Sequence, residues 1–450
     1  MLMSTQNLSI AEKSDRHSQL PPLMRTFERW TLIFFIISVC DHLFNHFVLH
    51  KHGYMSFPLT PDPSYHFADF WLFAEKFNHF HTVEFFQIGF PINYPATVAV
   101  VFQIFFKYFA PYSTTAFVTL IVLTLMIPAG LFAKTLIRRG IAPRAAWRFV
   151  AITWLLSWPV ALIIDGGNAE ILVWIAMLIG LWAYATGREW TAAIFLGLAA
   201  SLKLFPFVFL ALFLSRRQFP KLLAGAATFL IASVVSLKIL GPTISIAYHG
   251  ILYGLSSFKV NYMAMWHIQE NGVDHSLFAL IKFTLILAFH HVRTDFSGSL
   301  RAYLFLTAVG GTIAYFTYIR KLPLLNQVLI LSIVSIYLTA FSGDGTLIHL
   351  YYPLAMLFLL AIKAWRDGVT IPGLSTAIYC MVWCLSFESF LVVPYQYLGA
   401  RFIGQMHSIG LTVLLITALR YPFGPPLSED RGEIVLSEPV TGWVKGVQDR

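Results

Sequence analysis

Long apolar stretches, separated by short polar connections, follow one another along most of the chain. The most uniform of them cover residues 114–133, 171–185, 222–240 and 325–340. Each has or approaches the length of roughly 20 residues with which an α-helix crosses the hydrocarbon core of a bilayer. The pattern therefore predicts an all-α, polytopic membrane protein.

The composition agrees with a chain that lies largely in a bilayer. Hydrophobic residues make up 57% and charged residues 12% of the 450 residues. A typical soluble domain has roughly 25% charged residues. So few charges could not cover the surface of a soluble protein of this length.

The positive charges indicate which connections face the cytoplasm. The formal net charge is +9, and much of the basic excess lies in short connections between apolar stretches. Lysine and arginine concentrate in the cytoplasmic loops of membrane proteins. This distribution therefore favours a membrane topology over a nucleic-acid-binding patch. The basic residues of these connections are Arg138, Arg139, Arg144, Arg148, Arg216, Arg217, Lys221, Arg320 and Lys321.

Counting positive charges also defines a long first outer loop. The basic N-terminal tail and the Arg-rich connection 137–148 are both expected in the cytoplasm. A span at about 29–48 then runs outward, one span at 114–133 returns, and residues 49–113 form an outer loop. The apolar stretch 94–110 within this loop is predicted to be an interfacial helix. A span there would reverse the side of the Arg-rich connection.

The N-terminal residues 1–25 are polar and of mixed charge, without the apolar core of a signal peptide. We therefore expect no cleavable signal. The first span is expected to act as an uncleaved signal anchor.

The apolar segment 191–214 carries Lys203 and Pro206 at its middle. Basic residues flank both of its ends, and a single span cannot have both ends in the cytoplasm. Two short helices that meet around Lys203 near the outer side remove this conflict. Proline suits such a break because it lacks the backbone N–H that a continuous helix uses.

The remaining segments complete a prediction of about twelve transmembrane helices in a cell membrane. A hairpin of spans has its outer tip at residues 165–170, and a second outer loop covers about 241–300, with an interfacial helix at 277–289. Further spans are predicted at about 148–164, 169–186, 219–240, 301–319, 323–341, 347–364, 371–388 and 402–420. The predicted parts are a cytoplasmic tail at 1–28, a transmembrane domain at 29–420 and a cytoplasmic tail at 421–450.

This topology gathers carboxylate, histidine and lysine side chains on the outer side. A carboxylate there can act as a general base on an acceptor hydroxyl. Lysine and histidine can offset the charge of a phosphate leaving group. The residues concerned are Asp62, Asp69, Asp165, Glu170, Lys203, His249, Lys259, His267, Asp274, His275, Asp344 and His349.

Four of these residues allow both a functional and a structural interpretation. A lysine within a span costs about 2.5–3.5 kcal/mol on insertion scales, so Lys203 either faces a partner or cavity or snorkels to the interface. Asp69 opens an aromatic, helix-like stretch and suits either a helix N-terminus or a base. Asp165 fits a site or a solvated turn. His349 fits a phosphate contact or a hydrogen-bonded core position.

We expect no metal ion and no cofactor. The histidine pairs His79/His81 and His290/His291 have no nearby residues that complete a metal site. Walker, paired dinucleotide-binding and Ser/His/Asp motifs are absent from the sequence. The three cysteines, Cys40, Cys380 and Cys384, lie in or near apolar runs and indicate core packing rather than a disulfide or metal site.

Several short motifs at these positions carry a family resemblance. They are Asp69-Phe70, Asn93-Tyr94-Pro95, Gly167-Asn168, the stretch from Gly197 to Lys203-Leu-Phe-Pro206, Asn271 with His275-Ser276-Leu277, and His349 followed by Tyr352-Pro353. Over about 65–355 the chain resembles the integral-membrane glycosyltransferases of the GT-C fold. The closest resemblance is to glycosyltransferase family 87, which includes polyprenyl-phosphate-mannose-dependent mannosyltransferases.

The resemblance implies an inverting transfer of a hexose, such as mannose, from a polyprenyl-phosphate donor to a lipid or glycan acceptor on the outer face of the membrane. It implies that Asp69 is the catalytic base and that Lys203 and His349 lie near the donor phosphate. Asp165, Asn168 and His275 are the other expected substrate-binding residues. Relatives often have Gly-Gln in place of Gly167-Asn168, and Asn-Gln-Ser in place of the three residues that begin at Asp274. Both departures bear on the choice of sugar.

Two other classes of function remain open from the sequence. A secondary transporter or lipid-carrier flippase could use Lys203 and intramembrane carboxylates as a substrate pathway. Transporters often contain internal repeats, and the sequence shows none. A non-catalytic subunit for the assembly of surface polysaccharide is the second alternative.

Overall fold

Helices form nearly all of the structure. The computed structural model describes residues 19–48, 50, 67–72, 74–89, 91–264, 274–289, 295–387 and 400–424. No β-strand occurs among these residues, so the predicted all-α fold is confirmed. Most of the two predicted cytoplasmic tails and the first part of the first outer loop lie outside the described residues.

Four described segments are long and apolar enough to cross a membrane. They are α5 (Ser113–Arg138), α11 (Phe219–Leu240), α14 (Ser297–Thr317) with η7 (Ile319–Lys321), and η8 (Asp344–Leu350) with α16 (Tyr351–Asp367). A bent unit is made of α6 (Pro143–Val150), η3 (Ala151–Leu155) and α7 (Trp158–Gly166). Counted as one span, it brings the number to five. The chain is therefore a polytopic membrane protein, as predicted.

Further helices occupy the other positions at which spans were predicted. They are α2 (Pro22–Phe47), α8 (Glu170–Ala185), α9 (Glu189–Leu202), η4 (Phe205–Leu210) with α10 (Ala211–Ser215), α15 (Leu324–Tyr337), α17 (Leu374–Ser386) and α19 (Ala400–Arg420). Several are shorter than the roughly 20 residues that span a hydrocarbon core. The count of about twelve spans therefore stays a prediction.

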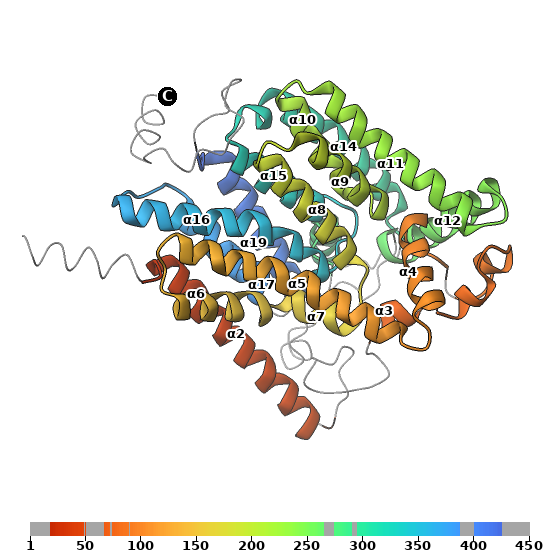
Figure 1. Cartoon of the computed structure of the whole chain (residues 1–450), viewed down its shortest axis with the longest axis horizontal. Coiled ribbons are helices and arrows are strands. Elements are labelled where there is room, and N and C mark those ends of the chain that lie inside the picture. The colour runs from red at the N-terminus through yellow and green to blue at the C-terminus, as the bar shows by residue number, and fades with distance from the viewer. Residues whose placement is uncertain are drawn as a thin grey trace, which may run out of the picture.

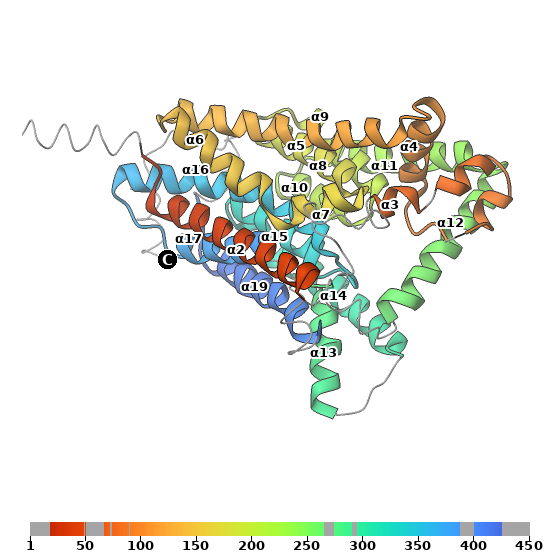
Figure 2. The ribbon, with the colours of Figure 1, turned by 90° about the horizontal axis from the view of Figure 1, so that it is seen from below.

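The long helices lie side by side and run roughly along the long axis of the molecule (Figures 1 and 2). Short elements gather at one end, where α3 (Ala68–Trp71) and α4 (Ala96–Tyr108) lie near α12 (Ile244–Phe258) (Figure 1). The Arg-rich turn between α5 and α6 lies at the opposite end. This separation agrees with the sides of the membrane that charge counting assigns to the two ends.

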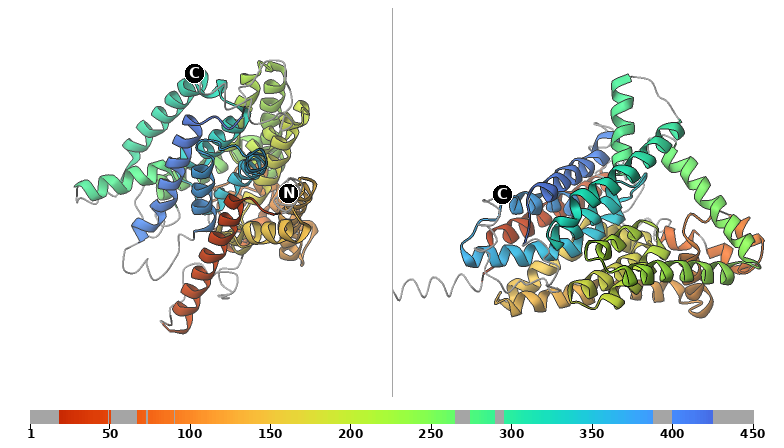
Figure 3. Two further views of the ribbon diagram at one scale, coloured as in Figure 1. Left: turned by 90° about the vertical axis from the view of Figure 1, so that its left-hand side faces the viewer. Right: turned by 90° about the horizontal axis from the view of Figure 1, so that it is seen from above.

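Two helices project away from the main bundle. α12 and α13 (Leu277–Phe289) extend beyond the layer of long helices (Figures 2 and 3). The limits of α13 coincide with the stretch 277–289 that was predicted to be an interfacial helix, and α4 covers most of the stretch 94–110. Their position at a membrane interface stays a prediction.

Apolar side chains cover the outward faces of the bundle. On α11, Leu230 is 57% and Ile231 is 64% exposed, and on α14, Phe305 is 67% and Leu306 is 66% exposed. Contiguous apolar surface of this kind is rare on soluble monomers. Lipid tails are the surroundings in which such faces are stable.

The span predicted at about 148–164 is interrupted by a bend. The helical axis turns by 58° between Leu155 and Trp158. The preceding turn, η3, is π-helical, and Pro159 stands at the start of α7. Both features break the regular ladder of helical hydrogen bonds, which accounts for the bend.

The break predicted at Lys203 is confirmed. Helix α9 ends at Leu202, and Lys203 has an extended backbone with φ −146° and ψ 145°. Pro206 then opens η4, which packs back against α9. A methyl group added at Gly197 of α9 would lie 2.2 Å from the backbone oxygen of Gly225 in α11. Small residues thus allow these two helices to approach closely.

The helix break makes a prediction about access to Lys203. In a variant without native cysteines, Lys203→Cys should react with a membrane-impermeant thiol reagent added from outside the cell, because charge counting predicts that the break lies at the outer end. Arg144→Cys, at an exposed position in the first turn of α6, should react only after the inner side is opened. Labelling of position 203 from the cytoplasm alone would overturn this topology.

Candidate functional site

The turn between α7 and α8 forms one wall of the site. Gly167 adopts the left-handed conformation with φ +61°, and a methyl group there would lie 3.0 Å from the Phe67 side chain and 3.1 Å from Phe70 Cβ. The Phe67 N–H donates to the Asp165 carbonyl oxygen at 2.7 Å. Glycine is therefore required both by the backbone conformation and by the close approach of the segment that carries Asp69.

Aromatic stacking fixes the short helix α3 and with it Asp69. The ring of Phe70 is fully buried. It stacks on Phe106 with centroids 4.5 Å apart and on Phe117 with centroids 4.6 Å apart. Asp69 is the second residue of α3 and lies inside the helix, so it is not the capping residue. It lies in the first turn of α3, so the favourable position at a helix N-terminus remains compatible with the structure, as does a role as base.

Asn168 joins Asp69 to the start of α8. Its Nδ2 donates to Asp69 Oδ2 at 2.6 Å, while its Oδ1 accepts from the Glu170 backbone N–H at 2.8 Å. Burial raises the pKa of the Asp69 carboxyl above its ordinary value, and the Asn168 hydrogen bond and the charge of Lys203 oppose this shift. Asp69 is thus an oriented carboxylate with a raised proton affinity.

Glu170 connects the two basic residues of the site. It is the first residue of α8, and its side chain is 1% exposed. One carboxylate oxygen, Oε1, lies 2.5 Å from His349 Nε2, and the other, Oε2, pairs with Lys203 Nζ. His349 belongs to η8 and is 2% exposed, while the Lys203 side chain is 24% exposed. A single buried carboxylate therefore holds an imidazole and an ammonium group.

Aromatic rings flank this group of charges. Lys203 Nζ lies 5.8 Å from the centre of the Tyr94 ring and 6.0 Å from that of Phe205. The Phe205 ring lies 5.0 Å from the ring of His349 at an angle of 73°. Burial and the negative charges of Asp69 and Glu170 raise the pKa of Tyr94 well above its ordinary value. Tyr94 therefore remains a neutral hydroxyl.

The structure brings four of the six predicted site residues into one continuous network. Asp69, Asn168, Lys203 and His349 are joined through Glu170. Asp165 takes part through its backbone carbonyl, which holds Phe67. Glu170 was grouped with the outer polar residues from the sequence but given no role. A carboxylate that opens an apolar helix needs a partner when it is buried, and this was the available signal.

His275 lies in a different cluster from the one predicted. Its Nδ1 is 3.1 Å from Asp344 Oδ1, and His407 Nδ1 is 3.3 Å from the same oxygen. The residues 274–276 precede α13 and pack against η8 and α19, which directs His275 away from Lys203. His407 was missed, because nothing marks a single histidine inside the apolar run 402–420.

The other predicted polar residues do not join the site. His79 Nδ1 lies 3.3 Å from Glu84 Oε2, and His81 Nδ1 lies 3.2 Å from the Ile239 carbonyl oxygen, so each has a separate partner. His249 and Lys259 are exposed. The residues Asp62, His267, His290 and His291 lie outside the described residues.

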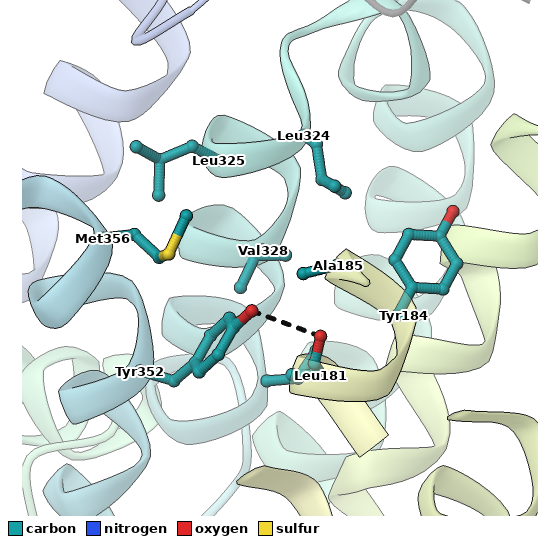
Figure 4. A pocket seen from close by; sticks show the side chains of 8 residues that line it. All are labelled: Leu181, Tyr184, Ala185, Leu324, Leu325, Val328, Tyr352 and Met356. Carbon is teal, nitrogen blue, oxygen red and sulfur yellow. Dashed lines mark hydrogen bonds between the residues drawn. The ribbon is translucent and has the colours of Figure 1, made fainter. Parts of the chain in front are cut away.

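A small apolar pocket lies near the far end of α8. Its walls come from α8, α15 and α16, and the Tyr352 hydroxyl donates to the Leu181 carbonyl oxygen at 3.2 Å (Figure 4). The pocket is lined by Leu181, Tyr184, Ala185, Leu324, Leu325, Val328, Tyr352 and Met356. It lacks charged groups, so it does not provide the chemistry found around Glu170.

Comparison with known proteins identifies a family for most of this region. The model of glycosyltransferase family 87 matches residues 92–342, more than half of the chain. The matched part contains Asn168, Glu170 and Lys203, whereas Asp69 and His349 lie outside it. Asp69 and His349 are connected to the matched part by their hydrogen bonds with Asn168 and Glu170, respectively. No curated protein matches the chain.

The pairing of Glu170 makes a prediction about stability. Glu170→Gln should lower the free energy of unfolding by about 3–5 kcal/mol, because removing one partner of a buried ion pair leaves the others without a counter-charge. Thermal denaturation of the purified protein in detergent measures the effect.

Two further variants make this test specific. Adding Lys203→Met to Glu170→Gln should recover part of the loss, since a charge is removed from each side of the pair. Glu84→Gln, at a carboxylate whose side chain is 63% exposed, should leave stability nearly unchanged. Wild-type stability of Glu170→Gln would contradict the pairing.

Proposed function

The chain belongs to glycosyltransferase family 87. We propose that it is an inverting enzyme that transfers a hexose, such as mannose, from a polyprenyl-phosphate donor to an acceptor on the outer face of the membrane. The observation that carries this proposal is the network around Glu170. It holds a lysine and a histidine beside an oriented aspartate.

Asp69 is the proposed general base. A base must hold the proton that it removes, and the raised pKa of Asp69 favours this. The oxygen of the acceptor hydroxyl attacks the anomeric carbon while its proton passes to Asp69. The bond between this carbon and the phosphate oxygen breaks, and the lipid phosphate leaves with the electron pair. Because attack and departure are in line, the anomeric configuration inverts.

Lys203 and His349 are the proposed phosphate-binding residues. Lys203 is partly exposed, so its ammonium group can reach an incoming phosphate while its pairing with Glu170 keeps it in place. His349 Nδ1 has no hydrogen-bond partner among the described residues and can donate to a phosphate oxygen when the ring is protonated. Positive charge that is in position before the reaction stabilises the developing charge of the leaving group.

The bilayer supplies the route for the donor. A polyprenyl chain dissolves in the hydrocarbon region, which surrounds the apolar faces of α11 and α14. The enzyme therefore needs no nucleotide-sugar site and, as proposed, no cofactor. Membership of a glycosyltransferase family favours this interpretation over the transporter or flippase and over the non-catalytic assembly subunit.

Replacement of the proposed base tests the mechanism directly. Asp69→Asn should lower the transfer rate by about 100-fold or more, because a general base typically contributes about 10²–10⁴-fold. The assay incubates purified protein with radiolabelled polyprenyl-phosphate sugars and candidate acceptors and identifies the product. Glu84→Gln, at an exposed outer carboxylate, is the matched control. Transfer at the wild-type rate by Asp69→Asn would refute the role of Asp69.

The pKa of Asp69 predicts how activity depends on pH. The base form is lost as the pH falls through this pKa, so kcat/KM should decline on the acidic side. The Asn168 hydrogen bond lowers the pKa. Asn168→Ala should therefore move the acidic limb of the profile to higher pH. Profiles of kcat/KM against pH for the two proteins measure this shift. An unchanged limb, or one moved to lower pH, would exclude Asp69 as the titrating group.

A further inference from the structure

A second buried polar cluster lies apart from the network around Glu170. It consists of His275, just before α13, Asp344, at the start of η8, and His407, in α19. The exposed fractions of their side chains are 0%, 1% and 0%. Polar groups buried to this extent need partners that satisfy every lone pair and proton.

Three electron-pair donor atoms of this cluster face one another. Nδ1 of His275 lies 3.1 Å from Asp344 Oδ1, and Nδ1 of His407 lies 3.3 Å from the same oxygen. The ligand atoms that the three residues offer all lie within 4.8 Å of one another.

The other nitrogen of each ring is already engaged as a donor. Nε2 of His407 lies 3.1 Å from the Phe387 carbonyl oxygen, which can only accept, so this nitrogen carries the hydrogen. In a neutral ring, Nδ1 then presents a lone pair. A lone pair that faces the Asp344 carboxylate is repulsive unless a proton or a metal cation lies between the two.

A chain of hydroxyl groups is compatible with the same state of His275. The Thr346 hydroxyl donates to the Gly343 carbonyl oxygen at 2.8 Å, and Ser342 Oγ lies 2.7 Å from Thr346 Oγ1. The Ser342 hydroxyl can therefore donate to Thr346 and accept from His275 Nε2, which lies 3.0 Å away. With its proton on Nε2, the neutral ring of His275 also presents the Nδ1 lone pair to Asp344.

We propose that His275, Asp344 and His407 bind a divalent transition-metal ion of the zinc class. Zinc bonds of about 2.0–2.2 Å at tetrahedral angles place neighbouring ligand atoms about 3.3 Å apart. The observed separations of 3.1 and 3.3 Å agree with this value. Imidazole ligands select zinc and its neighbours over magnesium or calcium, which prefer oxygen.

The surroundings hold these ligands in fixed orientations. The Trp158 indole N–H donates to Asp344 Oδ2 at 2.8 Å, and this bond orients the carboxylate. The His275 backbone N–H donates to the Ser342 carbonyl oxygen at 3.1 Å, and the Ser408 hydroxyl donates to the His275 carbonyl oxygen at 3.0 Å. Ligands of bound metals are typically fixed by outer hydrogen bonds of this kind.

The ion would connect three segments that are distant in the sequence. It would hold the start of η8 against α19 and the residues before α13. His349 lies toward the other end of η8. It is about 10 Å from Asp344 along the helix axis, at a rise of about 2.0 Å per residue of 3₁₀-helix. The role is structural, and it does not depend on the proposed function.

Elemental analysis tests the site without any activity assay. The full-length protein is purified with an affinity tag that contains no histidine, in buffers cleared of free metal, and its metal content is measured by mass spectrometry. We expect about one equivalent of zinc per chain. His407→Ala should lower this value at least about fivefold, while His249→Ala, at an exposed histidine, should not.

A second measurement on the wild-type protein covers the case in which His407→Ala does not fold. Removal of the ion with a chelator should lower the thermal denaturation midpoint, and added zinc should restore it. Cobalt in place of zinc should give visible absorption bands of a tetrahedral site. A metal content below about 0.1 equivalent, with no response to chelator or cobalt, would show that protons alone hold the cluster and would overturn the proposal.

Discussion

The burial of the Glu170 carboxylate is the constraint on which the site depends. A carboxylate that is 1% exposed in a membrane protein must be neutralised by nearby positive charge. Glu170 meets this requirement with two partners, Lys203 and His349, that come from segments far apart in the chain. The pairing in turn keeps the side chains of both basic residues oriented. A phosphate that enters the site would meet positive charge that is already in place.

The surrounding fold is arranged so that this pairing can form. The helix break after Leu202 brings Lys203 to the level of the α8 N-terminus. Gly167 allows the turn before α8 to press against Phe67 and Phe70, and the stacked rings around Phe70 hold Asp69 within reach of Asn168. Local backbone conformation and aromatic packing thus place Asp69, Lys203 and His349 around one buried carboxylate.

Properties encoded locally could be predicted from the sequence, whereas long-range pairings could not. Apolar lengths and charge counts predicted the helical segments, and Lys203 with Pro206 predicted the break, because each depends on neighbouring residues. Motif resemblance pointed to Asp69 and His349, and the structure places both in the network around Glu170. The contact of Glu170 with His349 and that of His275 with His407 join segments far apart in the chain. No local sequence pattern shows which partner such a buried group contacts. The bend between α6 and α7 was missed, since a π-helical turn has no clear sequence signature.

The most direct test of the account is an experimental structure of the protein with a bound polyprenyl-phosphate sugar, studied in the Asp69→Asn variant so that the donor is not consumed. We expect the phosphate within hydrogen-bonding distance of Lys203 Nζ and His349, with the anomeric carbon facing the side chain at position 69. A phosphate bound elsewhere, with Lys203 and His349 still paired to Glu170 alone, would contradict it.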